Sequence, residues 1–459
     1  MFENDVADGD RRNSLHRHWS SRFTFILAVT GSAVGLGNIW KFPYIAGQNG
    51  GGAFVLVYLF FVFLVGMPVM MSEILIGRRG RRNPVATMKL LGEEEGGASQ
   101  WRYLGYLAIV CSMLILSYYS FIAGWALSYV YESVSGTFVD ASIAEVTATY
   151  QGFASNWVAT AIAHTLFMAT TVALVARGVK RGLEWAVRLM VPALVGLMIL
   201  LLVFSINTGY FSAGVEFLLA PNFSELSWSG VLIALGQAFF TLSIGIGAVM
   251  AYGAYLPQET SIPGTAAVVV CADTVIALLA GLIVFPIVFA NGLDPAEGPG
   301  LVFMTLPSAF GQMSGGILYA AVFFLLLSFA AWTSAFSLME PSVAWVVERF
   351  NRSRVEAAVI IGFLIWLMGF GSVLSFSVLS GFKFYKGTIY ENIDHLTSNI
   401  LLPIGGFFIV VFAGWVMCRN STAEELGGVG PAYSVWRFLA RYVAPVAIVV
   451  VFLQTSGLL

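Results

Sequence analysis

The stretch Gly31-Ser-Ala-Val-Gly-Leu-Gly-Asn38 lies in the middle of the first long apolar segment of the chain, where a membrane-spanning helix should be most regular. A second stretch, Thr241-Leu-Ser-Ile-Gly-Ile-Gly247, holds the same position in a later apolar segment. Each contains a Gly-x-Gly sequence with polar neighbours, which favours a break in the helix. Close packing of helices through small residues is the alternative explanation for either stretch alone. The matched positions make a pair of broken helices the better interpretation.

The composition around these stretches is that of a membrane protein. Of the 459 residues, 58% are hydrophobic and only 10% are charged, whereas about 25% of a soluble domain is charged. The apolar residues form segments of about 20 residues, which is the length needed to cross a bilayer. We therefore predict an all-α polytopic membrane protein with about eleven transmembrane helices. The predicted spans are 20–48, 52–78, 101–133, 157–176, 182–206, 229–256, 262–291, 316–348, 355–379, 389–417 and 434–458.

The two broken segments are the first and the sixth of these spans. An offset of five is odd, so the second copy crosses the membrane in the opposite direction, which is the signature of an inverted repeat. The predicted organisation is an N-terminal cytoplasmic segment at 1–19, a first five-helix repeat at 20–206, a second, inverted five-helix repeat at 229–417, and an eleventh helix at 434–458.

The basic residues predict the orientation, because Lys and Arg are enriched in cytoplasmic loops. The segments 132–156, 207–228 and 291–315 contain no Lys or Arg and are expected outside the cell. Lys383 and Lys386 depart from this pattern. We predict a multi-pass protein of the plasma (inner) membrane with a cytoplasmic N-terminus. The basic clusters lie at the ends of apolar segments, so the bilayer, and not nucleic acid, is the expected partner. They are Arg11, Arg12 and Arg17 before the first span, Arg78, Arg79, Arg81 and Arg82 after the second, Arg177, Lys180 and Arg181 after the fourth, and Arg349, Arg352 and Arg354 after the eighth.

A helix that breaks inside the hydrocarbon region exposes N–H and carbonyl groups that no water can satisfy. The N-termini of the half-helices suit a carboxylate, and the exposed carbonyls suit Na⁺ or an ammonium group. An amino acid zwitterion together with a cation therefore fits a pair of breaks better than an uncharged sugar does.

Asp273 lies in the middle of an apolar span. A carboxylate at that depth costs several kcal/mol unless a cation pairs with it or it is neutral. A cation site is the favoured interpretation, and a protonated carboxyl group bonded to a neighbouring helix is the alternative.

A series of motifs extends along nearly the whole chain: Trp19 to Gly52, Gly66-Met-Pro68, Glu73, Tyr118-Tyr119, Gly178 to Glu184, Gln237-Ala-Phe-Phe-Thr-Leu-Ser243, Thr333-Ser334 and Thr397-Ser-Asn399. Through these motifs the sequence resembles the neurotransmitter:sodium symporter family, whose members share the LeuT-like fold. It departs from the family at Lys41, where arginine is usual, and at Asp273, where many members have asparagine. The animal members have twelve spans, against the eleven predicted here.

The resemblance implies two sodium sites, each with the oxygen ligands that suit a hard cation. The first would use Asn38, the Ala33 carbonyl, Thr241, Asp273 and the carboxylate of the substrate. The second would use the carbonyls of Gly31, Val34 and Ala330 and the hydroxyls of Thr333 and Ser334. A Ser or Thr in mid-helix often bonds only to its own preceding turn, which is the alternative for the two hydroxyls. Because Asp273 already supplies a negative charge beside the first site, chloride is not expected to be required.

The same resemblance implies the substrate pocket. The amides of Leu36 and Gly37 and the Tyr119 hydroxyl would hold a carboxylate. The carbonyls of Ala33, Phe240 and Thr241 and the Ser243 hydroxyl would hold an amine. A charged side chain would have no partner there, so neutral, hydrophobic L-amino acids are the expected substrates. The residues expected around the substrate side chain are Ile115, Tyr119, Phe240, Ile246, Ser334 and Leu338.

Alternating access needs a closure on each side of the pocket. By resemblance, Lys41 and Asp394 form the outer charged gate, with Tyr119 and Phe240 as the aromatic lid. Glu73 is expected to accept N–H groups freed by a helix break. The inner closure is expected to comprise Trp19, Arg17, Tyr255 and Glu348.

The predicted function is Na⁺-coupled uptake of amino acids. A proton-coupled carrier of the same fold is one alternative, separated by whether Asp273 binds Na⁺ or cycles a proton. An amino-acid channel or a sensor derived from a transporter is another, separated by counterflow. An enzyme is not expected, because the four histidines match no metal-binding spacing and no nucleophile motif is present.

Overall fold

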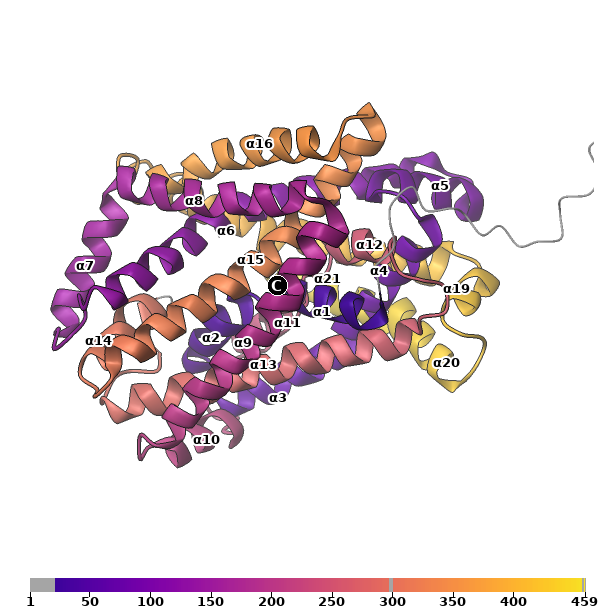
Figure 1. Ribbon diagram of the computed structural model, residues 1–459. Helices are drawn as coiled ribbons and strands as arrows, with labels where there is room; N and C mark the ends of the chain where they lie inside the picture. Colours follow the sequence, from indigo (N-terminus) through magenta and orange to yellow (C-terminus); the bar gives the residue numbers. More distant parts are fainter. Residues whose placement is uncertain (1–20, 297–299, 456–457, 459) are drawn as a thin grey trace, which may run out of the picture.

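The computed structural model describes residues 21–296, 300–455 and 458, which form a bundle of helices (Figure 1). Within these residues the only β-structure is two isolated bridges, Gly51 with Pro221 and Phe384 with Gly387. The first ten helices are α1 Arg22–Ala33, α2 Phe42–Gln48, α3 Gly52–Phe61, α4 Met67–Gly80, α5 Pro84–Gly96, α6 Arg102–Val134, α7 Ile143–Ser155, α8 Trp157–Ala176, α9 Glu184–Ile206 and α10 Phe211–Leu219.

The second part of the chain continues in the same way. Its helices are α11 Trp228–Thr241, α12 Ala248–Gly253, α13 Ile262–Ala290, α14 Leu306–Gly311, α15 Gly316–Phe350, α16 Arg354–Ser375, α17 Ile389–His395, α18 Leu402–Val411, α19 Arg419–Glu425, α20 Pro431–Phe438 and α21 Ala444–Thr455. Short helical turns join or extend them: η1 Gly37–Lys41, η2 Val62–Gly66, η3 Ser99–Trp101, η4 Val179–Leu183, η5 Leu301–Thr305, η6 Leu396–Leu401, η7 Phe412–Val416 and η8 Leu439–Val443.

The helices are long and apolar enough to confirm a polytopic membrane protein. Nine helical segments of the described chain qualify alone as spans, and a tenth is the pair Phe23–Ala33 and Gly37–Gln48, which is bent by 48°. The predicted sixth span is divided into α11 and α12, and α11 has only 14 residues. The boundaries predicted for the two repeats stay a prediction.

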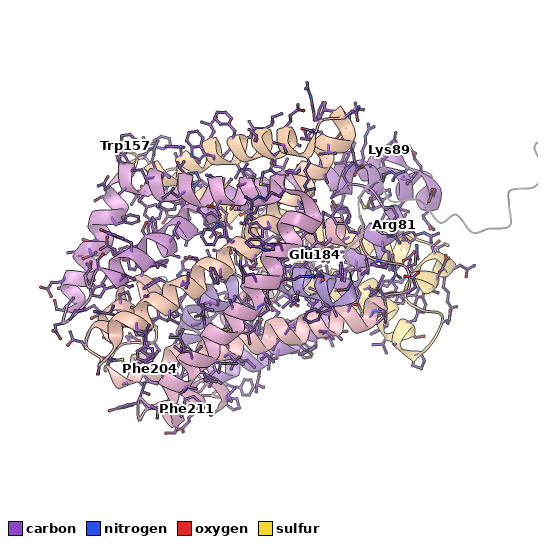
Figure 2. All side chains as sticks on the ribbon, in the orientation of Figure 1. Arg81, Lys89, Trp157, Glu184, Phe204 and Phe211 are labelled. Carbon is purple, nitrogen blue, oxygen red and sulfur yellow. The ribbon has the colours of Figure 1, made fainter. Side chains whose placement is uncertain are left out.

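Side chains at the surface show where the bilayer lies. Large apolar residues on α8, α9 and α16, among them Leu166, Leu189 and Phe363, are more than half exposed. The charged side chains gather elsewhere: Figure 2 places Arg81 and Lys89 at the end of the molecule where α5 lies. In Figure 1, α5, α19 and α20 occupy this end, and α7 and α14 occupy the other. We call the end with α5, α19 and α20 the basic end.

Helices also form in segments where the hydrophobic pattern predicts only loops. α7 lies within 132–156, α10 within 207–228 and α14 within 291–315. α7 begins with a reciprocal cap, in which the Ser142 hydroxyl accepts from the Glu145 N–H and the Glu145 side chain accepts from the Ser142 N–H. These helices are too short to cross the membrane, so the length of the apolar segments does not predict them.

The centre of the bundle is built around α15. This helix packs against α6, α9, α1 and α12, so that it lies beside both broken segments. α6 is its main neighbour and crosses the same central region. Together, α6 and α15 form one continuous wall of the space between the break after α1 and the break after α11.

Candidate functional site

Both Gly-rich stretches break their helices in the structure. α1 ends at Ala33, and Val34 turns the backbone into an extended conformation, with ψ 105°. After α11 ends at Thr241, the backbone takes positive φ at Ser243 (51°), Gly245 (87°) and Gly247 (72°) before α12 begins. Glycine adopts this left-handed conformation at little cost, which explains two of these three positions.

A buried carboxylate satisfies part of the second break. The Gly245 N–H donates to Glu73 Oε1 at 2.5 Å, and Glu73 is fully buried. An unpaired N–H in this position would cost a few kcal/mol. Glu73 therefore accepts an N–H group that the helix break has freed, as expected.

Between the two breaks lies a small pocket, lined by residues of both breaks and of α6 and α15. No charged side chain lines it among the described residues. It brings together every predicted substrate residue except Thr241, and adds Gly35 and Leu402. Its lining consists of Ala33, Gly35, Leu36, Gly37, Ile115, Tyr119, Phe240, Ser243, Ile246, Ser334, Leu338 and Leu402.

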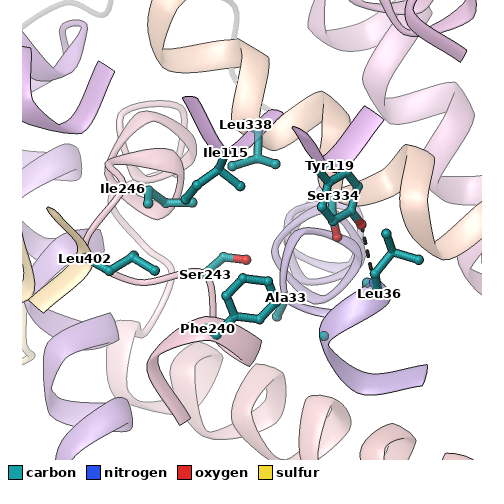
Figure 3. Close-up of a pocket in the computed structure, with 12 residues that line it drawn as sticks. Ala33, Leu36, Ile115, Tyr119, Phe240, Ser243, Ile246, Ser334, Leu338 and Leu402 are labelled. Atoms are coloured by element: carbon teal, nitrogen blue, oxygen red, sulfur yellow. Dashed lines mark hydrogen bonds between the residues drawn. The ribbon is translucent and has the colours of Figure 1, made fainter. Parts of the chain in front are cut away.

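The pocket has a polar side and an apolar side (Figure 3). The hydroxyls of Tyr119 and Ser334 lie near Leu36, and the Leu36 N–H donates to Tyr119 Oη at 3.3 Å. The apolar side consists of Ile115, Ile246, Leu338 and Leu402. Such a lining can hold a ligand with a polar head and a hydrophobic side chain.

Gly35 and Ser32 complete the polar side, and the sequence prediction missed both. A Cβ on Gly35 would lie 2.9 Å from Tyr119 Oη and would collide with the Ser334 hydroxyl, so the absence of a side chain lets these two groups converge. The Ser32 carbonyl accepts from Ser243 at 3.0 Å and from Ser334 at 3.1 Å. This carbonyl thereby links the end of α1 directly to the second break and, separately, to α15.

A first cluster of oxygen ligands lies beside the pocket, where Asn38, Thr241 and Asp273 are almost completely buried. Asn38 Nδ2 donates to Asp273 Oδ1 at 2.7 Å and to Thr241 Oγ1 at 2.8 Å, and the Thr241 hydroxyl lies 3.1 Å from Asp273 Oδ2. The side chain of Thr241 therefore faces this cluster and not the pocket.

The donor set of this cluster fits a hard monovalent cation. Asn38 Oδ1 accepts from the Gly35 N–H at 3.1 Å, and a carbonyl oxygen keeps a second lone pair for an ion. Asp273 has no cationic side chain within ion-pair distance in the described part of the chain, so a bound cation would supply the missing charge.

A second oxygen cluster lies where α1 meets α15. Thr333 Oγ1 lies 3.4 Å from the Val34 carbonyl and donates to the Ala330 carbonyl at 3.0 Å, and Ser334 Oγ lies 3.3 Å from the Val34 carbonyl. A Cβ on Gly31 would lie 3.2 Å from Thr333 Cβ, which places Gly31 beside them. The structure thus brings Val34, Ala330, Thr333 and Ser334 together and places Gly31 beside them, and their role as cation ligands stays a prediction.

The predicted outer gate has a different arrangement from a closed ion pair. The Lys41 ammonium group lies over the Phe240 ring, 4.1 Å from its centroid, a cation–π contact. Asp394 accepts from the Ser398 hydroxyl at 3.0 Å, and no ion pair within 4.0 Å joins it to Lys41. The role of these two residues as a gate stays a prediction.

The predicted inner closure is described only in part, because Trp19 and Arg17 lie outside the described residues. The Tyr255 hydroxyl donates to Glu340 at 2.9 Å. Glu348 accepts from the Asn83 N–H and side-chain amide, both at 2.7 Å. Glu348 therefore fastens the start of α5 to the end of α15.

Arg354 also lies near the inner closure. The sequence predicted it only as part of a basic cluster and not as a partner of Glu340. Its guanidinium group binds both oxygens of Glu340 at 2.9 and 2.5 Å, and its Nε donates to the Val175 carbonyl at 2.9 Å. The buried Glu340 was the available signal, because a carboxylate at membrane depth needs a partner. The pairing joins α15, α16, α8 and the end of α12.

Comparisons with known proteins agree on one family. The model of the "Sodium:neurotransmitter symporter family" matches residues 16–161 and 156–457. The chain is 39% identical to the sodium-dependent transporter YhdH of Bacillus subtilis (strain 168), over 96% of this chain and 98% of that one. It is 27% identical to the sodium- and chloride-dependent taurine transporter of Bos taurus, over 75% of this chain and 62% of that one. Among solved structures, MhsT in complex with L-phenylalanine matches with a TM-score of 0.89 and 39% identity, over 96% of this chain and 100% of that one.

Proposed function

This chain belongs to the sodium:neurotransmitter symporter family, and on that premise we propose that it takes up neutral, hydrophobic L-amino acids together with Na⁺ by alternating access. Sodium-coupled transport itself follows from the family, which consists of symporters and not enzymes. The amino-acid class, the binding residues and the coupling are the proposal.

The observation that carries the proposal is the two-sided pocket between the helix breaks. The Leu36 and Gly37 N–H groups and the Tyr119 hydroxyl would hold the carboxylate of the substrate. The substrate amine would lie near the Ser243 hydroxyl and the carbonyls of Ala33, Phe240 and Thr241. The apolar side of the pocket would enclose a hydrophobic side chain. MhsT, the similar solved structure, is in complex with L-phenylalanine, which has these three parts.

Coupling would arise from the position of the first oxygen cluster. Asn38 and Asp273 lie next to the break that forms the pocket, so a cation there can share the substrate carboxylate as a ligand. Each ligand would then raise the affinity of the other by the same factor. The second cluster, with Thr333 and Ser334, would hold a second Na⁺ between α1 and α15 and fix their relative position.

The protein would lie in the plasma (inner) membrane with the basic end in the cytoplasm. Figure 2 places Arg81 and Lys89 at this end, and ion pairs join Arg78 to Glu425 of α19 and Arg79 to Glu95 of α5. Positive charge concentrates on the cytoplasmic side of membrane proteins. In that orientation the pocket would open alternately toward the two ends of the bundle.

The function is tested by uptake of labelled L-phenylalanine into liposomes that contain the purified protein. We expect accumulation when the outside buffer contains Na⁺ and the inside contains K⁺, and competition by L-leucine but not by L-lysine. Accumulation driven by a pH gradient without Na⁺ would favour the proton-coupled alternative. Binding without uptake or counterflow would favour a sensor.

Chloride is expected to be dispensable in the same liposomes. Asp273 supplies a fixed negative charge beside the first cation cluster, so no mobile anion is needed there. Replacement of chloride by gluconate on both sides should leave the rate of Na⁺-driven uptake unchanged within about twofold. Loss of uptake in gluconate, restored by added chloride, would show that the charge of Asp273 does not replace the anion.

A further inference from the structure

Three arginines at the basic end have no ion pair with a described carboxylate, unlike Arg78 and Arg79 near them. Arg419 begins α19, Arg437 lies in α20 and Arg441 in η8. None of them has an ion pair within 4.0 Å to a described carboxylate. Arg78, by contrast, binds Glu425 at 2.6 Å.

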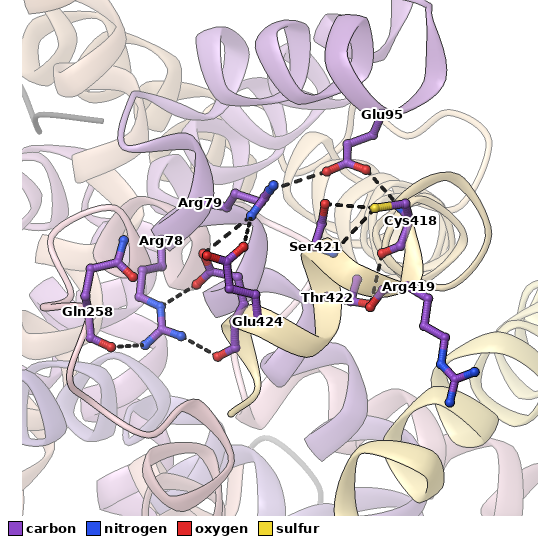
Figure 4. A network of polar contacts seen from close by, with 10 residues as sticks. Arg78, Arg79, Glu95, Gln258, Cys418, Arg419, Ser421, Thr422 and Glu424 are labelled. Atoms are coloured by element: carbon purple, nitrogen blue, oxygen red, sulfur yellow. Dashed lines mark hydrogen bonds and ion pairs between the residues drawn. The ribbon is translucent and has the colours of Figure 1, made fainter. Parts of the chain in front are cut away.

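The acidic residues close to them form ion pairs with Arg78 and Arg79 (Figure 4). Arg79 pairs with Glu95 at 3.4 Å and with Glu424 at 3.2 Å. Burial opposes ionisation of Glu95, but hydrogen bonds from Ser421 and Cys418 and the charge of Arg79 hold its pKa below the usual range. In Figure 4 the Arg419 side chain points away from this network.

Short contacts join Arg419 to Arg437, and Arg441 follows Arg437 by four residues in the helical segment Pro431–Leu453, on the same side of that helix. Arg437 donates to Tyr433 Oη at 3.0 Å and to Thr422 Oγ1 at 3.2 Å, and the Tyr433 hydroxyl donates to the Arg419 carbonyl at 3.2 Å. The Arg441 guanidinium lies 4.0 Å from the centroid of the Trp415 ring, and its Nε is buried without a hydrogen-bond partner. A guanidinium group has five N–H donors, so several stay available on each arginine.

Two features place this surface at the level of the lipid headgroups. Trp415 is the second-last residue of the apolar segment Ile389–Val416, and no charged residue follows Arg441 in the sequence. Trp415, Phe438 and Tyr442 are 51%, 58% and 48% exposed. Exposed Trp and Tyr beside arginines are typical of the membrane interface.

We propose that Arg419, Arg437 and Arg441 bind the headgroup of an anionic phospholipid, with the exposed rings of Trp415, Phe438 and Tyr442 against its glycerol and upper acyl region. Arginine matches a phosphate through paired N–H donors, and its stacking on Trp415 leaves the guanidinium edge free to donate. No carboxylate in the described part of the chain pairs with these three arginines, and the lipid phosphate would supply that charge. The site lies away from the amino-acid pocket and does not depend on the proposed substrate.

The test uses native mass spectrometry of the full-length protein in detergent that contains equal amounts of phosphatidylglycerol and phosphatidylcholine. The measured quantity is the ratio of the two lipids that stay bound to the protein. We expect the wild type to retain phosphatidylglycerol preferentially. Each interfacial arginine contributes about fivefold, so the double variant Arg437→Gln with Arg441→Gln should lose roughly thirtyfold of this preference. The matched control is Arg352→Gln, which removes one positive charge from an arginine that pairs with Glu356.

The control should bind phosphatidylglycerol like the wild type, and Arg441→Lys should lose part of the preference, because it keeps the charge but not the paired N–H donors. The melting temperature and the size-exclusion profile, measured on every variant, identify those that are folded. Equal retention of the two lipids by the wild type would overturn the proposal. So would an unchanged preference in the folded double variant, an equal loss in Arg352→Gln, or displacement of the lipid by inorganic phosphate.

Discussion

Replacement of Asp273 by alanine is expected to weaken Na⁺ binding by about a hundredfold or more and to weaken amino-acid binding with it. Removing one partner of a buried ion pair costs about 3 to 5 kcal/mol, and each 1.4 kcal/mol is about a factor of ten. Asp273 is fully buried and contacts both Asn38 and Thr241, so a substituted alanine leaves a cation there with neutral ligands only. The measurement is the dissociation constant of L-phenylalanine over a series of Na⁺ concentrations.

The matched variant is Asp273→Asn, which keeps the volume and one oxygen and should lose less affinity. The melting temperature without Na⁺ separates binding from packing, because alanine removes an unpaired buried charge and should not destabilise the empty protein severely. If Asp273→Ala binds L-phenylalanine with wild-type affinity at every Na⁺ concentration, Asp273 is not a ligand of the coupling ion.

The Tyr119→Phe variant is expected to bind every substrate amino acid about ten- to a hundredfold more weakly. A hydroxyl that donates to a carboxylate away from water contributes about 1.5 to 3 kcal/mol. The Tyr119 oxygen lies at the polar side of the pocket beside Leu36, and its ring stays in place when the oxygen is removed. The loss should therefore be the same for leucine, valine and phenylalanine at saturating Na⁺.

The neighbouring residue provides the control. Tyr118 is also buried in α6, but its ring packs against Tyr390, with centroids 5.7 Å apart, and it does not line the pocket. Tyr118→Phe should leave the affinities unchanged. A loss in Tyr119→Phe that is confined to large substrates, or no loss, would show that Tyr119 packs against the substrate without binding its carboxylate.

Much of the fold could be predicted from the sequence because a membrane restricts the choices. Long apolar segments must become helices in hydrocarbon, and a Gly-x-Gly in such a segment disrupts the helix. The breaks after Ala33 and Thr241 accordingly fall within the two predicted stretches. α7, α10 and α14 were missed because short helices between spans have no long apolar segment to mark them.

The part of the candidate site that is built from side chains in family motifs could be predicted from the sequence. The convergence of Tyr119, Phe240 and Ser334 on one pocket follows from the motifs. Gly35 was missed because its contribution is the absence of a side chain, and Ser32 because it contributes its carbonyl oxygen. These contributions depend on how α15 approaches the break, which no local pattern in the sequence reports.

Contacts between distant segments were the other unpredicted part. Arg354 reaches Glu340 because α16 turns back beside α15, and this distance cannot be read from a basic cluster in the sequence. The Lys41 ammonium group similarly lies over Phe240, a position that follows from the placement of α11 beside η1.

The central claim is that one site couples a neutral amino acid to Na⁺, and equilibrium binding tests it most directly. Labelled L-phenylalanine is titrated onto the purified wild-type protein in Na⁺ and in choline at equal ionic strength. The account predicts saturable binding in Na⁺ that weakens progressively as choline replaces Na⁺, since the ion and the substrate carboxylate would share ligands around Asn38 and Asp273. Equal affinity for L-phenylalanine in Na⁺ and in choline would contradict it.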